Sequence, residues 1–288
     1  MIRVESPGLL TTVQDLGRPG YAHLGVSASG AADALALRVG NKLVGNGENA
    51  AALEMTLMGG AFGFDSDAVA ALTGSDFGGE RGRPFTVRAG EILRLGPTRS
   101  GARCYLSVRG GIDVPLVLGS ASTHVLTGLG GRPLKRGDWL AIGADPGRAP
   151  LWRGVEWNRE RLAPLRVTPG PQADWFGREL DGLVYEVKEE SNRMGLRLRG
   201  PKLAQSRELL TEGVSLGSIQ IPPEGEPVIL FVEHQTTGGY PKIANVISAD
   251  LWRVGQLRPR DQVRFETVTL EQALALLREQ EAWLGALA

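Results

Sequence analysis

The sequence predicts a mainly β protein with two domains and few helices. Three observations carry this prediction. The chain of 288 residues contains 40 glycines and 17 prolines, scattered between short apolar stretches, which is typical of many short strands joined by tight turns. Several segments alternate at period two, as the strands of a barrel or sandwich do. With 42% apolar residues the chain is also long enough to bury a core in each of two domains.

Charge and cysteine content exclude several classes of partner. Lys+Arg and Asp+Glu are balanced at 32 each, so no long-range field attracts nucleic acid or an anionic membrane. The lone Cys104 cannot form an internal disulfide. The start of the chain lacks a signal-peptide pattern, and no apolar run is long enough to span a bilayer. We therefore expect a soluble, cytoplasmic protein whose binding depends on local groups of residues.

A long polar connection from 11 to 33 is the first candidate site. Loops of this length in compact domains are usually functional or disordered, and the apolar and aromatic residues here argue against disorder. The connection runs into a helix expected from Ser29 to Val44, whose start can seat a carboxylate or phosphate unless Ser29 only caps its own helix. The connection contains the polar residues Gln14, Asp15, Arg18, Tyr21, Ser27 and Asp33, and the helix carries an apolar stripe of Leu35, Val39 and Leu43.

Three further segments of the first half predict strands. They are PFTVRAGEILRLGP (84 to 97), read as two strands meeting at Ala89-Gly90, the alternating ARCYLSVRGG (102 to 111), and GDWLAIG (137 to 143). Arg109 ends the second segment, just before a glycine pair. An arginine there can hold a carboxylate or phosphate through two parallel hydrogen bonds. The alternative is an ion pair at the surface or between domains.

The stretch from 143 to 164 predicts the domain boundary, because it is rich in Pro, Gly, Arg and Trp and has no clear periodicity. We expect an N-terminal domain over 1–150 and a C-terminal domain over 163–288. The halves open similarly with RVESPG and RVTPGP, and each has a polar turn before a late strand (GDWLAIG and RDQVRF), a weak sign of duplication. A terminal helix is predicted by the capping-box pair Thr269 and Gln272 and by the shared apolar face Leu270, Ala273, Leu274, Leu277 and Leu284.

Two segments of the second half could contact a ligand. SNRMGLRLRG (191 to 200) places Asn192 and Arg193 before strand residues. HQTTGGYPK (234 to 242) follows the apolar run PVILFV and offers glycines, hydroxyls, an amide and Lys242. Composition alone favours a strand turn with a solvated lysine.

The usual signatures of several site classes are missing from the sequence. There is no Gly-x4-Gly-Lys-Ser/Thr phosphate loop and no Gly-x-Gly-x-x-Gly opening a helix. The three histidines are isolated, so no metal-ligand cluster is expected. GVSLG around Ser215 matches the nucleophile elbow of serine hydrolases, but a strand and turn, not a helix, are expected after it.

Several motifs together resemble one family. They are TTVQDLGRPGY, LEMTLMGG, SVRGGIDVPLVLGSAST, SNRMGLRL and QTTGGYPKIANVISADLWRVGQLRPRD, and they extend in order from residue 2 to about 268. The chain is identified by them as a member of the family that holds the C subunits of 5-oxoprolinase, the KipI antagonists and allophanate hydrolase subunit 2. This is a carboxyltransferase domain that we assign to subdomain C/D. At one position the chain departs from the family's pattern, with Glu233 in place of an aspartate.

The resemblance implies a fold of two similar cyclophilin-like β-barrel domains with a few short helices. It also implies one subunit of an ATP-dependent amidohydrolase, which opens 5-oxoproline to glutamate together with subunits A and B. A lactam carbonyl is a poor electrophile, and phosphorylation of its oxygen makes it reactive where cationic and N–H groups hold the developing charge. ATP is expected to bind to the complex, either on this chain or on a partner subunit.

The site implied for this chain lies between the two barrels. Arg109, Lys242 and Asp15 are its candidate catalytic residues, and the candidate substrate-binding residues are Gln14, Arg18, Ser29, Asn192, Gln235, Thr236 and Tyr240. We expect Arg109 and Lys242 to lie in solvent-facing loops, so that replacing either would not unfold the protein. Two alternatives stay open: biotin-dependent carboxyl transfer to urea or another amide, and a regulatory, non-catalytic partner of a kinase-inhibitor-like protein.

Overall fold

The computed structural model describes residues 1–156, 163–176, 180–204 and 207–287, which form two compact units. Unit 1 comprises Met1–Arg18, Ser29–Arg159 and Gly285–Ala288, and unit 2 comprises Pro19–Ala28 and Glu160–Leu284. The chain thus leaves unit 1 after the second strand and returns to it before the first helix. The expected boundary stretch from 143 to 164 lies partly outside the described residues, and the domain bounds 1–150 and 163–288 stay a prediction.

Unit 1 contains two antiparallel five-stranded sheets in the part of the chain that is described. One has the order β7-β4-β1-β10-β9 and the other β2-β3-β8-β5-β6. Strands that follow each other closely in sequence enter different sheets, so that the chain crosses between layers at tight turns. The strands are β1 (Ile2–Ser6), β2 (Leu10–Gln14), β3 (Ala52–Thr56), β4 (Ala61–Phe64), β5 (Ala68–Gly74), β6 (Pro84–Val87), β7 (Ile92–Arg94), β8 (Arg103–Val108), β9 (Ile112–Asp113) and β10 (Trp139–Ile142).

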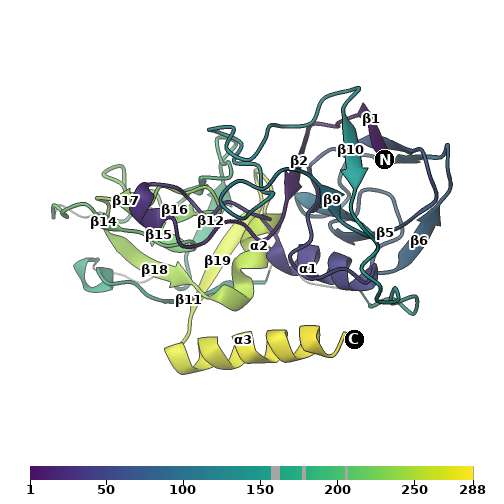
Figure 1. Ribbon diagram of the computed structural model, residues 1–288. Helices are drawn as coiled ribbons and strands as arrows, with labels where there is room; N and C mark the ends of the chain where they lie inside the picture. The colour runs from purple at the N-terminus through teal and green to yellow at the C-terminus, as the bar shows by residue number, and fades with distance from the viewer. Residues whose placement is uncertain (157–162, 177–179, 205–206, 288) are drawn as a thin grey trace. The chain divides into compact units, whose positions relative to one another are not determined.

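An apolar core fills unit 1 between its two sheets, and α1 (Ala34–Leu43) covers the outer face of the second sheet by packing on β5 and β8 (Figure 1). This explains why all six residues of β8 are buried. Cys104, Leu106 and Val108 belong to the inter-sheet core, whereas Tyr105 packs with the start of α1. Burial raises the pKa of the Cys104 thiol to about 12.

Unit 2 is a closed barrel of seven strands in the order β11-β18-β15-β16-β13-β12-β19. A two-stranded ribbon of β14 and β17 stands beside the barrel strands. The barrel closes through a parallel pairing of β11 with β19, while its other pairings are antiparallel. The strands of this unit are β11 (Leu165–Pro169), β12 (Val184–Val187), β13 (Gly195–Arg199), β14 (Glu212–Gly213), β15 (Ser218–Gln220), β16 (Val228–Leu230), β17 (Thr237–Gly238), β18 (Lys242–Val246) and β19 (Gln262–Thr267).

Short helices complete the described part of unit 2. The 3-10 turns are η1 (Ala22–Leu24), η2 (Ala173–Trp175) and η3 (Ser248–Asp250), and the α-helices are α2 (Leu251–Gln256) and α3 (Leu270–Gly285). The predicted capping box of α3 is confirmed: Thr269 N donates to Gln272 Oε1 over 2.8 Å, and Gln272 N donates to Thr269 Oγ1 over 3.1 Å. Its predicted apolar face is only partly buried, since Leu270 is 68% exposed.

The fold class is thus mainly β with few helices, as predicted, but a second closed barrel is not shown. In the described residues of unit 1, the two strands predicted between 84 and 97 do form, on either side of Gly90 in a left-handed conformation (φ +83°). They pair with β5 and β4 in different sheets and not with each other. Because the turn at Gly90 carries the chain from one sheet to the other, β6 and β7 do not continue one sheet as neighbouring strands of a barrel would.

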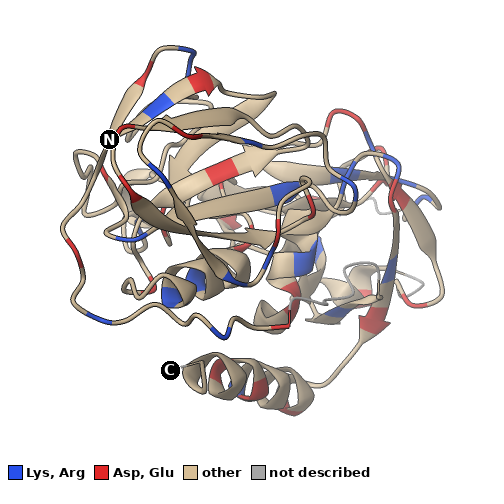
Figure 2. Ribbon diagram, turned by 90° about the vertical axis from the view of Figure 1, so that its right-hand side faces the viewer, with Lys and Arg blue, Asp and Glu red and all other residues tan. Residues whose placement is uncertain are grey.

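Two further features bear on function. Basic and acidic residues are interspersed along the chain (Figure 2). No helix among the described residues is both long and apolar enough to cross a membrane.

Candidate functional site

The Asp15 carboxylate organises a buried polar cluster in unit 1. It accepts hydrogen bonds from Ser120 Oγ (2.6 Å), from Ser122 Oγ and from the backbone N–H groups of Ala121 and Gly17 (both 2.8 Å). The Asp15 side chain is 2% exposed. Carboxylates that accept several charge-assisted bonds of this kind are held rigidly. Asp15 therefore joins the end of β2 to the segment 120–123, which lies more than 100 positions later in the sequence.

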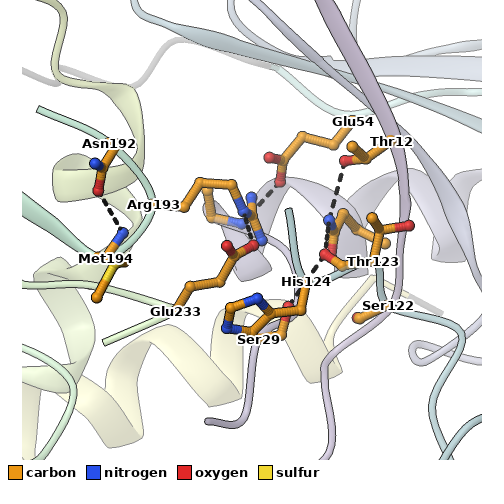
Figure 3. Close-up of polar contacts among 12 residues, drawn as sticks. Thr12, Ser29, Glu54, Ser122, Thr123, His124, Asn192, Arg193, Met194 and Glu233 are labelled. Carbon is orange, nitrogen blue, oxygen red and sulfur yellow. Dashed lines mark hydrogen bonds and ion pairs between the residues drawn. The ribbon is translucent and has the colours of Figure 1, made fainter. Parts of the chain in front are cut away.

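The side chain of Gln14 lies in the same cluster and is fully buried. Its Nε2 donates to Thr12 Oγ1 and to the Thr123 carbonyl oxygen, both over 2.9 Å. The Thr123 carbonyl also accepts from Ser29 Oγ over 3.2 Å. Figure 3 shows Thr12 and Ser29 on either side of Thr123. The Gln14 Oε1 atom is buried with no hydrogen-bond partner in the described chain, and an unsatisfied buried acceptor costs about 1–3 kcal/mol.

Ser29 does not begin a helix, and this corrects the expectation that the helix runs from Ser29 and seats an anion there. The helix starts at Ala34, and the Asp33 side chain caps it by accepting from Ala36 N over 2.8 Å. Ser29 instead has a left-handed backbone (φ +58°). The reason is a pair of long-range contacts that hold the residues before the helix in a non-helical path: Ala32 N donates to Glu54 Oε2 and Asp33 N to Tyr105 Oη, both over 2.8 Å.

Glu54 and Tyr105 form the support of this path. The Tyr105 hydroxyl donates to Glu54 Oε2 over 2.6 Å, and Arg103 Nε lies 3.6 Å from Glu54 Oε1. Burial and the neighbouring Glu54 carboxylate raise the pKa of Tyr105 well above its ordinary value. The phenol therefore stays protonated and keeps donating, so that the segment carrying Ser29 is fixed against β3 and β8.

Arg18 and Arg109 both bind within unit 1. Arg18 is 1% exposed, and it donates through Nε to the Val117 carbonyl (3.2 Å) and through Nη2 to the Ser122 carbonyl. Arg109 forms a bidentate pair with Asp145, at 2.9 Å from Nε and 2.6 Å from Nη2, and its Nη1 donates to two backbone carbonyls. Its side chain is 17% exposed, so it is not the solvent-facing loop residue that we expected.

Lys242 is also not a solvent-facing loop residue. It begins β18, its side chain is 6% exposed, and its Nζ forms an ion pair with Glu212 of β14. Gln172 joins both residues: its Nε2 donates to Glu212 Oε1 over 3.2 Å, and its Oε1 accepts from Lys242 N over 3.0 Å. The hydrogen bond from Lys242 lowers the pKa of Glu212. The position of Lys242 shortly after a glycine pair does not reveal this burial, because the partner lies 30 residues earlier.

Two residues of the segment 235–241 form a short strand where we expected only a turn. Thr237 and Gly238 make β17 and pair with Gly213 and Glu212 of β14. The side chain of Gln235 donates through Nε2 to Gln220 Oε1 over 3.3 Å, and a Cβ at Gly238 would lie 2.8 Å from Gln220 Nε2. A side chain at 238 would thus collide with the buried Gln220 amide. The glycine thus allows the Gln220 amide to approach β17 closely.

Asn192 lies just before β13, next to Arg193, whereas Thr236 and Tyr240 flank β17, where Tyr240 is 46% exposed. Arg193 Nε forms a buried ion pair with Glu233, and Asn192 Oδ1 accepts from Met194 N over 2.8 Å (Figure 3). Glu233, where the resemblance led us to expect an aspartate, is 3% exposed. Burial lowers the pKa of the adjacent His234. A glutamate is accommodated here because its longer side chain reaches the Arg193 guanidinium within the unit.

The structure therefore brings some predicted residues together and separates others. In unit 1, Gln14, Asp15, Arg18 and Ser29 all contact the segment 120–123, whereas Arg109 contacts Asp145. In unit 2, Gln235 contacts Gln220, Lys242 contacts Glu212 and Gln172, and Asn192 lies apart from both in the turn before β13. Sequence reasoning missed the partners of these residues: Thr12, Glu54, Ser120, Ser122, Thr123, Gln172, Glu212 and Gln220. The polar run GSAST (119–123) was the one local signal that could have pointed to three of them. Convergence of both units on one cleft stays a prediction.

The fold and these motifs place the chain among carboxyltransferase-domain proteins. The family described as "Carboxyltransferase domain, subdomain A and B" matches residues 24–267. Our assignment to subdomain C/D was wrong, because the matching family is that of subdomains A and B. The motifs quoted from the sequence indicate the carboxyltransferase domain but do not distinguish subdomains A and B from subdomains C and D.

Relatives narrow the class further. The chain is 39% identical over its full length to the C subunit of 5-oxoprolinase from Escherichia coli, 98% of which is covered, and 38% identical to the C subunit of 5-oxoprolinase from Haemophilus influenzae, with 95% of this chain and 93% of that one covered. It also superposes on the crystal structure of Kluyveromyces lactis urea carboxylase with a TM-score of 0.92 and 33% identity, covering 100% of this chain and 29% of that one. The chain belongs to the family of 5-oxoprolinase C subunits.

Proposed function

We propose that this chain acts as the C subunit of an ATP-dependent 5-oxoprolinase, which converts 5-oxoproline, ATP and water to glutamate, ADP and phosphate together with subunits A and B. The observation that carries the proposal is the match to two bacterial C subunits over nearly the full length of both chains. The urea carboxylase, by contrast, is matched over less than a third of its length.

The chemistry of the unit 1 cluster supports an amide or lactam as the ligand. A ligand of this class presents one N–H donor and one carbonyl acceptor to the protein. The cluster around Asp15 offers fixed polar groups, of which the Gln14 amide and the Ser29 hydroxyl are held by one carbonyl, that of Thr123. Pre-positioned polar groups of this kind orient a substrate without reorganisation at the moment of reaction.

We assign structural roles to the candidate cations. Arg109 is paired with Asp145 and Lys242 with Glu212, each within its own unit. Asp15 is saturated by four donors, so we assign it the positioning of the segment 120–123 and not proton transfer. These assignments replace the charge-stabilising roles that the sequence suggested for Arg109 and Lys242.

We propose that ATP is bound by a partner subunit. The glycine segment at 238–239 was the best candidate for holding phosphates, but its Gly238 pairs with Glu212 in a strand and the nearby Lys242 is neutralised. This segment thus does not fit a phosphate cradle, and we route no step through ATP on this chain. A cytoplasmic location is proposed with the same function.

The experiment is reconstitution with subunits A and B. Glutamate formation from 5-oxoproline and ATP is measured with A and B alone, with this chain added, and with the Escherichia coli C subunit added as the positive control. We expect turnover only when a C subunit is present. If the Escherichia coli protein restores turnover and this chain does not, the proposal is wrong.

A second candidate is biotin-dependent carboxyl transfer to urea or another amide, favoured by the TM-score of 0.92 with urea carboxylase. The sequence has no Met-Lys-Met biotin-attachment segment, so a carrier protein would have to supply the carboxyl group. Transfer of labelled bicarbonate to urea in the presence of a biotinylated carrier would support this function. A regulatory partner without chemistry would show neither activity but would bind one protein stably.

We further propose that the two units are diverged copies of one cyclophilin-like barrel. The similar openings RVESPG and RVTPGP support this, because both contribute to the first strand of their unit, β1 and β11. The late strands GDWLAIG and RDQVRF both pair with that first strand, although β10 does so antiparallel and β19 parallel. A crystal structure of the 163–288 segment superposed on 1–150 tests the proposal.

A further inference from the structure

The amide group of Gln14 is fixed in one orientation by its neighbours. Its nitrogen donates to the Thr123 carbonyl oxygen and to Thr12 Oγ1, both over 2.9 Å. A carbonyl oxygen only accepts hydrogen bonds, so the atom of Gln14 that faces Thr123 must be the nitrogen. Both amide hydrogens are thereby used, and the oxygen points elsewhere.

The Gln14 oxygen is the unexplained part of this arrangement. The side chain is 0% exposed and Oε1 has no hydrogen-bond partner in the described chain. Buried polar atoms of native proteins are nearly always paired, so each exception asks for an explanation. Linking β2 to Thr123 needs only the nitrogen. The Gln14 oxygen is therefore a neutral acceptor without a role in this link, and only an N–H or O–H donor can satisfy it.

A second feature lies at the same carbonyl. Ser29 donates its hydroxyl to the Thr123 oxygen over 3.2 Å from a backbone held at φ +58°. Non-glycine residues adopt this conformation only where the surroundings impose it, and such positions cluster at ligand-binding sites. The network of Glu54 and Tyr105 imposes it here through Ala32 and Asp33. After this bond, Ser29 Oγ still has acceptor capacity, so both side chains next to Thr123 offer acceptors.

We infer that Gln14 Oε1 accepts the N–H of the substrate amide and thereby distinguishes a lactam from a lactone or an N-alkylated lactam. The inference rests on the proposed function, since 5-oxoproline carries one such N–H. The N–H becomes a stronger donor when the lactam oxygen is activated, because electron density is drawn from nitrogen toward the carbonyl carbon. A hydrogen bond that strengthens in this way favours the transition state over the ground state.

Access to the oxygen requires local movement, because the atom is buried. The segment that begins at Gly17, shortly after Gln14, runs through exposed residues at Pro19–Gly20 and Ala22–Gly25 before it returns at Ser29. We expect ligand binding to be slower than for an open site, since association rates fall where binding needs a conformational change. The selectivity, however, is an equilibrium property of the bound state.

The test compares ligands that differ by one group. Dissociation constants of 5-oxoproline, its lactone analogue and N-methyl-5-oxoproline are measured on the assembled complex of the three subunits. The wild-type complex is expected to bind the lactam about tenfold or more tightly than either analogue, because a buried acceptor left without a donor is unfavourable. This arm needs no variant, so a misfolded protein cannot obscure it.

Two variants locate the selectivity. Gln14→Met keeps the length of the side chain but removes the acceptor, and the preference for the lactam is expected to fall to near onefold. Thr12→Val is the matched control: it removes one partner of the Gln14 nitrogen but leaves Oε1, and the preference is expected to persist. Thermal unfolding midpoints of both variants report on folding, and Gln14→Asn, which withdraws the oxygen, replaces Gln14→Met if that variant does not assemble.

The outcomes separate the two proposals. A complex that turns over 5-oxoproline but binds lactam and lactone equally well overturns the inference alone. Selectivity that survives in Gln14→Met, or in Gln14→Asn in its place, does the same, because the N–H is then read by another group. A complex that neither binds nor turns over 5-oxoproline, next to an active complex containing the Escherichia coli protein, overturns the proposed function and the inference with it.

Discussion

Replacement of Asp15 by alanine is expected to destabilise unit 1 strongly. The change removes the acceptor of four hydrogen bonds from Ser120, Ser122, Ala121 and Gly17. The two hydroxyls can rotate toward other acceptors, but the two backbone N–H groups cannot. Each buried N–H left unsatisfied costs about 1–3 kcal/mol. Because Ala121 is buried and Gly17 only half-buried, we expect a loss of about 3 kcal/mol in the free energy of unfolding.

The assay is urea unfolding together with amide hydrogen exchange. If the slope of the unfolding free energy against urea concentration is the same in the variant and the wild type, the substitution has changed the stability and not the unfolded state. The Ala121 amide is expected to exchange much faster in Asp15→Ala than in the wild type. Asp67→Ala is the matched control, because Asp67 also accepts from a backbone N–H, that of Ala89 over 2.9 Å, but its side chain is 54% exposed. If Asp15→Ala loses no more stability than Asp67→Ala, the reasoning from burial is refuted.

Three other predictions follow from the described contacts. Gly40→Ala is expected to destabilise by about 1–3 kcal/mol although alanine is the better helix former, because its Cβ would lie 2.5 Å from Ser107 Oγ; a stabilised variant in urea unfolding would contradict this. The hydrogen bond from Arg132 lowers the pKa of Asp138 from 3.8 to about 2, so the stability that this pair adds is present above about pH 4 and is lost as the pH falls toward about 2. The difference between wild type and Arg132→Ala, measured by urea unfolding from about pH 5 to about pH 2, should therefore shrink with acidity, and a constant difference would argue against the linkage. Cys104, with a pKa raised to about 12 by burial, should resist a thiol reagent at about pH 8 until the protein is unfolded; labelling of the folded protein at the rate of a free thiol would show that the site is open.

Features specified by neighbours in sequence were predicted well. The capping box of α3 depends on Thr269 and Gln272, three residues apart, and it formed as expected. Strand β8 and the turn at Gly90 were likewise visible in the alternation of residue type and in the glycine. The family could be predicted because its motifs extend over nearly the whole chain.

Features specified by distant partners could not be predicted. The helix begins at Ala34 because Glu54 and Tyr105, 22 and 72 residues away from their partners, hold Ala32 and Asp33 outside it. Similarly, the burial of Lys242 depends on Glu212. A lysine and a glutamate are both usually found at the surface, so the sequence gives no sign that Lys242 and Glu212 pair. It also does not show which residues face each other where two distant segments meet.

The candidate site shows the same division. Gln14, Asp15 and Arg18 were singled out because polar residues were concentrated in one long connection, and Ser29 because it was the expected helix start. What the sequence lacked was the segment 120–123, which collects all four through its serines and carbonyls. Without that partner, Asp15 was a candidate catalytic residue, and the positioning role that we propose for it depends on its four donors.

The most direct measurement of the central claim is the stoichiometry of coupled turnover. A complex of subunits A and B with this chain is supplied with 5-oxoproline as the substrate. ATP consumption and glutamate formation are then measured in the same reaction. We predict one ATP hydrolysed for each glutamate formed, and neither product above background when this chain is left out. Equal glutamate formation without this chain, or ATP hydrolysis that proceeds without glutamate while the Escherichia coli protein gives coupled turnover, would contradict the assignment.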